Sequence, residues 1–121
     1  MAFVYDAKSN KITCPRSNSG AVQVSVTGLE MGTDDVVEFY IREKGGGARL
    51  VELVEKPVNG VCIFALPSIR TRLLPPGRYT WNLRIATSPV FDEEGKLVEA
   101  GDGGEMVTVW NNAPEFEVLE V

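Results

Sequence analysis

Alternation of apolar and polar residues is the feature that most constrains what this chain can fold into. In "AVQVSVTG" valines occupy positions 22, 24 and 26, and polar residues lie between them. In "VVEFYIREK" the same alternation places Val37, Phe39 and Ile41 on one side. A period of two puts successive side chains on opposite faces of a strand, so each segment predicts a strand with one buried face.

Most other segments also favour strands over helices. The glycines at 45–47 predict a hairpin loop, because glycine reaches positive φ without strain. The apolar spacing in "ARLVELVEK" also suits a helix, but Pro57 and the Asn59-Gly60 pair soon end it, which favours a strand. The run "VCIFAL" is apolar throughout and predicts a central strand covered on both faces.

The number and spacing of these segments predict the fold class. About eight strands alternate with turn residues, and almost no segment favours a helix. The 121 residues suit a single domain spanning residues 1–121, and 44% of them are hydrophobic, enough for one core. We therefore expect an all-β, antiparallel, immunoglobulin-like β-sandwich, with a β-barrel as the alternative.

The segment "LLPPGRYTWNLRI" predicts how one of these strands begins. Its Leu74, Gly77 and Tyr79 resemble the tyrosine corner of immunoglobulin-like sandwiches, in which a buried tyrosine hydroxyl bonds the backbone a few residues upstream. Tyr79 and Trp81 share a strand face with two aliphatic residues. This favours a core face over a stacking surface for sugars or bases. The residues expected to define the fold are Leu74, Gly77, Tyr79 and Trp81.

Charge is unevenly distributed in the second half of the chain. Residues 57–90 contain four arginines and no acid, whereas residues 91–121 contain nine acids and one lysine. One interpretation is cross-strand ion pairing on a solvent face. The other is a subunit whose basic side meets the acidic side of a neighbour.

Five residues are therefore candidate interface residues. In the first interpretation Glu115 and Glu117 face Arg78 or Arg84 on a neighbouring strand. In the second, Arg78 and Arg84 lie where a partner is expected to bind. Trp110 joins them because "MVTVW" is apolar on both faces and suits an edge strand.

Catalysis and metal binding find little support in the sequence. The chain has no histidine, so Ser-His and Cys-His nucleophiles are absent. Cys14 and Cys62 suit free, buried thiols in a reducing compartment. The acidic loop "FDEEGKLVEAGDGGE" lacks EF-hand spacing, which favours a solvated hairpin over a calcium site. We expect no enzyme activity, no cofactor and no bound metal.

Partners other than proteins are also not expected. The net charge of −5 disfavours attraction to nucleic-acid backbones. The N-terminal residues lack the pattern of a signal peptide, and no run approaches the roughly 20 apolar residues of a membrane span. Synthesis in a cytoplasm without membrane contact is the expectation.

Three segments together resemble a family of small β-sandwich domains in structural proteins of tailed phages. They are "NKITCPRSNSGAVQVSVTG", "DDVVEFYIREK" and "GVCIFALPSIRTRLLPPGRYTWNLRI", and they are similar to the N-terminal domain of phage baseplate upper proteins. The resemblance implies a virion protein of the tail, baseplate or head-tail region, made in the cytoplasm of a host bacterium. It also implies assembly with other virion proteins and with copies of itself. A carbohydrate-binding or adhesion module is the alternative.

Overall fold

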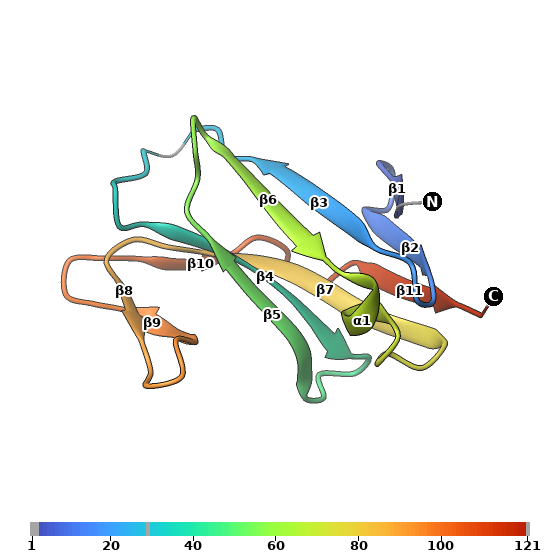
Figure 1. Cartoon of the computed structure of the whole chain (residues 1–121). Helices are drawn as coiled ribbons and strands as arrows, with labels where there is room; N and C mark the ends of the chain where they lie inside the picture. The colour runs from blue at the N-terminus through green and yellow to red at the C-terminus, as the bar shows by residue number, and fades with distance from the viewer. Residues whose placement is uncertain (1–2, 29, 121) are drawn as a thin grey trace.

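The computed structural model describes residues 3–28 and 30–120, and these residues form an all-β structure (Figure 1). Eleven strands and one helical turn lie within them. They are β1 (Val4–Asp6), β2 (Lys11–Pro15), β3 (Gly20–Ser25), β4 (Val36–Glu43), β5 (Arg49–Glu55), β6 (Val61–Leu66), α1 (Ser68–Thr71), β7 (Gly77–Ala86), β8 (Pro89–Phe91), β9 (Leu97–Ala100), β10 (Met106–Thr108) and β11 (Glu115–Leu119).

The strands form one large sheet and two small ones. The large sheet has seven strands in the order β1-β2-β11-β7-β4-β5, with β10 also paired to β7. The pairs β3-β6 and β8-β9 are separate two-stranded sheets. All these pairs are antiparallel except β2 and β11, which run parallel from the pair Ile12 and Phe116 onwards. The expectation of a wholly antiparallel fold is therefore wrong, because β2 and β11 enter the sheet in the same direction.

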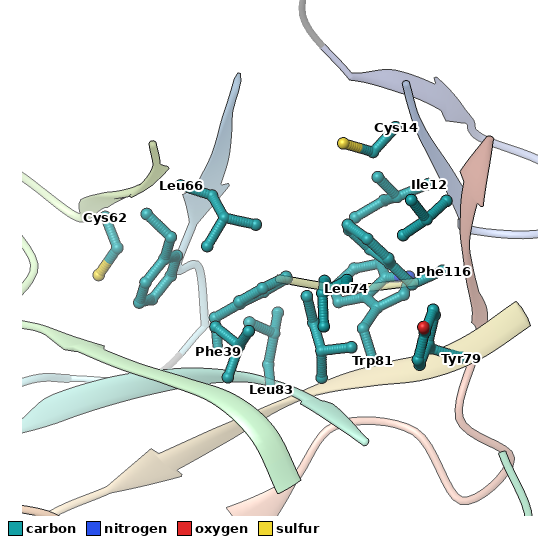
Figure 2. Packing of buried hydrophobic residues seen from close by; sticks show 14 of the residues in the cluster. Ile12, Cys14, Phe39, Cys62, Leu66, Leu74, Tyr79, Trp81, Leu83 and Phe116 are labelled. Carbon is teal, nitrogen blue, oxygen red and sulfur yellow. The ribbon is translucent and has the colours of Figure 1, made fainter. Parts of the chain in front are cut away.

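The hydrophobic core lies between the β3-β6 pair and one face of the large sheet (Figures 1 and 2). Phe64 of β6 stacks on Phe39 of β4 with ring centroids 5.7 Å apart, and Phe39 lies 5.5 Å from Trp81 of β7. Strands β4 and β7 contribute their expected inward faces to this core, β2, β5, β6 and β11 contribute other buried side chains, and the valines of β3 pack against it partly buried. Alternation therefore predicted correctly which side chains point inwards.

The apolar strand β6 is covered on one face only. Cys62, Phe64 and Leu66 are buried, but Ile63 is 57% exposed and Ala65 is exposed as well. The prediction of a central strand covered on both faces is wrong. Its physical reason is that β6 belongs to a two-stranded layer whose outer side has no further layer above it.

An interruption separates β10 from β11 along the same side of β7. The backbone N–H of Val109 donates to the carbonyl of Leu83, and the N–H of Trp81 donates to the carbonyl of Pro114. Between these two bonds the side chain of the buried Asn82 donates to the carbonyl of Trp110 at 2.9 Å and accepts from its N–H at 3.2 Å. Residues 111–114, "NNAP", connect the two strands, and Asn82 holds the start of this connection in place.

Candidate interaction surfaces

The start of β7 has the predicted tyrosine contact. The buried hydroxyl of Tyr79 donates to the carbonyl of Pro75, four residues upstream, and burial raises the pKa of this hydroxyl. Leu74 is 4% exposed beneath the turn. Gly77 has φ = 153°, a conformation that residues with a side chain rarely adopt. Trp81 is also buried, and its Nε1 donates to the carbonyl of Asn10 at 2.9 Å.

Arg78, Glu115 and Glu117 lie together on the outer face of the large sheet, as predicted. Arg78 Nε lies 4.0 Å from a carboxylate oxygen of each glutamate. Lys11 of β2 lies closer, with its Nζ 3.1 Å from Glu115 Oε2 and 2.8 Å from Glu117 Oε1. Hydrogen bonds to both glutamates raise the pKa of Lys11, and the lysine lowers the pKa of Glu117. The sequence did not identify Lys11, because its position depends on the parallel pairing of β2 with β11.

Arg84 belongs to a different cluster, centred on Glu38 of β4. Its Nε donates to Glu38 Oε1 at 2.7 Å, and Arg49 Nη1 donates to the same oxygen at 3.2 Å. The Nη2 of Arg84 donates to the carbonyl of Leu97 in β9, which ties the β8-β9 hairpin to the sheet. The arginine side chain is only 14% exposed, so its charge is used inside the subunit.

The expectation that Arg84 faces Glu115 or Glu117 is wrong for a reason of register. Strand β11 pairs with β7 only over Gly77–Thr80, and β10 takes its place opposite Arg84. The true partner, Glu38, is fully buried, and its Oε2 has no hydrogen-bond partner among the described residues. One signal in the sequence pointed to it, because Glu38 is the only charge in the six-residue run "VVEFYI".

Trp110 faces inwards instead of standing on an exposed sheet face. Its ring meets Trp81 edge-on, with centroids 4.9 Å apart. It also lines two neighbouring pockets along β3. One has a volume of about 320 Å³ and includes Phe3, and the other has a volume of about 290 Å³ and includes Val109. Both are lined by Val24, Leu83 and Trp110, and we refer to the two pockets together as the groove.

The acidic loop and the cysteines have mainly structural contacts. Asp92 Oδ1 accepts backbone N–H groups of Glu94 and Lys96, both at 2.9 Å, which closes the predicted β8-β9 hairpin. Over residues 3–28 and 30–120, no three His, Cys, Asp or Glu side chains come together in a group that could hold a metal. Cys14 and Cys62 are free and buried as predicted, and Figure 2 shows them far apart in the core. Burial raises the pKa of Cys14 to about 11.

Two aromatic side chains are exposed in the described part of the chain. They are Tyr5 on β1 and Phe91 on β8, which are 54% and 42% exposed. Figure 1 places β1 and β8 at opposite ends of the molecule. Tyr5 and Phe91 therefore do not form one aromatic surface, whereas Tyr5 shares the pocket along β3 with Phe3, Trp81 and Trp110. No helix in the described segments is both long and apolar enough to cross a bilayer.

Comparison with known protein families, with curated proteins and with solved structures gave no match.

Proposed function

We propose that this protein is a structural component of a tailed-phage virion, in the tail, baseplate or head-tail region, and that it works through protein-protein contacts. The phage setting rests on the resemblance of residues 10–28, 34–44 and 60–85 to small domains of phage structural proteins. The immunoglobulin-like sandwich is part of the same proposal. The Tyr79 corner and the packing of β3-β6 on the large sheet support it.

The observation that carries an assembly function is the outer face of β6. Ile63 is 57% exposed, and the other exposed residues of the β3-β6 pair, Ala21, Gln23, Ser25 and Ala65, carry no charge. An apolar strand face of this kind gains free energy when another protein surface excludes water from it. Neighbouring virion proteins are the partners we propose for it.

Incorporation into particles tests this proposal. The wild-type protein and two variants are supplied to a phage lacking its own copy, and purified particles are analysed by immunogold microscopy and mass spectrometry. Ile63→Lys places a charge on the β6 face, whereas Val58→Lys places one on the β5-β6 turn, where Val58 is 71% exposed. We expect gold label on the tail or neck for the wild type and Val58→Lys, and strongly reduced label for Ile63→Lys.

Two results would overturn the proposal. One is that the wild-type protein is absent from purified particles. The other is specific binding to a glycan array, which would favour an adhesion module.

A further inference from the structure

We infer that two copies of this chain associate by antiparallel pairing of their β3 strands across a two-fold axis. The inference rests on the proposed assembly function, for which it names one contact and one partner. It is carried by three features of β3: an unpaired edge, an apolar groove beside that edge, and the absence of charge along the strand.

The first feature is the unpaired edge. Strand β3 pairs only with β6, and the N–H of Val26 donates to the carbonyl of Gly60 at 2.7 Å in the same register. In an antiparallel ladder every second residue bonds its neighbour and the others point away. Ala21, Gln23 and Ser25 therefore direct their N–H and C=O groups away from β6. Within the described residues no hydrogen bond uses these groups.

The second feature is the groove beside this edge. Its lining comes from β3 itself and from Trp81, Leu83 and Trp110 on the facing sheet. Val22 and Val24 of β3 point towards this side and are only partly buried. A strand added to β3 would direct its alternate side chains into the groove, as β3 directs its own valines.

The third feature is the missing protection of the edge. Natural proteins guard such edges with lysine, proline or a bulge. The strand Gly20–Ser25 has none of these, and residues 17–28 carry no charge at all, in a chain whose net charge is −5. Two acidic copies repel each other over much of their surface, but not along this strand.

These features fit a second copy of β3 because the strand is complementary to itself. Placing Gln23 opposite Gln23 of the second copy sets Ala21 opposite Ser25 on both sides. The backbone N–H and C=O groups of Ala21, Gln23 and Ser25 all point away from β6, so each of these residues donates and accepts a hydrogen bond across the axis. The same register sets Val22 opposite Val24 of the other copy, above the groove. The result is a continuous four-stranded layer, β6-β3-β3-β6, and a two-fold interface in which the same patch serves both subunits.

The experiment measures molar mass by sedimentation equilibrium over a concentration series. We expect the wild type to form dimers, and both Gln23→Lys and Gln23→Glu to weaken dimerisation at least about tenfold, because like charges meet at the axis. An equimolar mixture of the two variants should recover the dimer. Val58→Lys is the control, since Val58 is 71% exposed in the turn between β5 and β6 and belongs to neither proposed surface. It should dimerise like the wild type.

Gln23 is exposed, so its variants should keep the native circular dichroism spectrum. A second readout is amide hydrogen exchange, in which residues 21, 23 and 25 should be protected in the wild type and exchange rapidly in Gln23→Lys. If the wild type is monomeric throughout, or if the Gln23 variants dimerise as well as the wild type, the β3 contact is overturned. Neither result bears on the proposed virion function, which is tested separately by the particle and glycan-array experiments.

Discussion

Replacing Glu38 with glutamine removes a charge from the best-buried ion pair of this protein without changing the size of the side chain. Glu38 is 0% exposed, and its Oε1 accepts from Arg84 at 2.7 Å and from Arg49 at 3.2 Å. Hydrogen bonds to a charged group contribute about 1.5–3 kcal/mol, and neutral ones about 1 kcal/mol. In Glu38→Gln both donors remain charged arginines, so only part of this difference is lost, about 1 kcal/mol per bond or about 2 kcal/mol over the two bonds.

Two further effects modify this figure. Glu38 Oε2 has no partner, so a glutamine amide placed there adds a buried donor without an acceptor, at about 1 kcal/mol or more. In the other direction, the side chains of Arg84 and Arg49 are 14% and 26% exposed, and water can compensate part of the loss. We expect Glu38→Gln to lower the free energy of unfolding by about 2–3 kcal/mol, or the melting temperature by about 10 °C.

Urea unfolding followed by the fluorescence of Trp81 and Trp110 measures this change. The matched control is Glu117→Gln, the same substitution in an ion pair with Lys11 at 2.8 Å, where the carboxylate is 23% exposed. This pair is partly exposed and contributes little, so the unfolding midpoint of Glu117→Gln at neutral pH should fall much less than that of Glu38→Gln. Equal effects in the two variants would refute the reasoning from burial. A more stable Glu38→Gln would show that desolvation of the charge outweighs its pairing.

Three further predictions follow from the core and the outer face. Tyr79→Phe should reduce stability by about 1 kcal/mol through loss of the bond to Pro75, and an unchanged urea midpoint would contradict the corner. Cys14 and Cys62 should react with Ellman's reagent at pH 8 only after denaturation, because both are buried and Cys14 has a pKa of about 11; rapid reaction of the native protein would contradict this. The pKa of Glu117 is lowered from 4.5, so its stabilising effect is complete above pH 4.5 and is lost as the pH falls through the folded-state pKa. Unfolding midpoints between pH 6 and pH 3 should therefore fall less in Glu117→Gln than in the wild type, and identical pH profiles would argue against the pair.

Local patterns predicted the strands of this fold well. Alternation placed the inward residues of β3, β4 and β7 correctly, because the side-chain period of a strand is a property of its own backbone. The Tyr79 corner was predictable for a similar reason, since its donor and acceptor are four residues apart. In these cases the physics that decides the structure acts within a short segment.

Properties that depend on distant strands were not predictable. The exposure of Ile63 depends on whether a further layer covers β6, and an all-apolar run gives no information about that. The burial of Glu38 in β4 depends on Arg84 of β7, on Arg49 of β5 and on the β8-β9 hairpin, which Arg84 contacts through the carbonyl of Leu97. These groups are far from Glu38 in the sequence or lie on other strands. The predicted pairing of arginines with glutamates is present where β11 lies beside the start of β7, and absent where β10 replaces β11 opposite Arg84.

The parallel pairing of β2 with β11 has a consequence for how this chain reaches its native state. Ile12 and Phe116 are neighbours in the sheet although nearly the whole sequence separates them. Closing so long a loop is entropically costly and is slow in folding. During synthesis β2 cannot pair with β11 until residues 115–119 have been translated and have left the ribosome. A nascent chain stalled before residue 115 should therefore remain open at this end and bind chaperones, while the β4-β5 hairpin can already form.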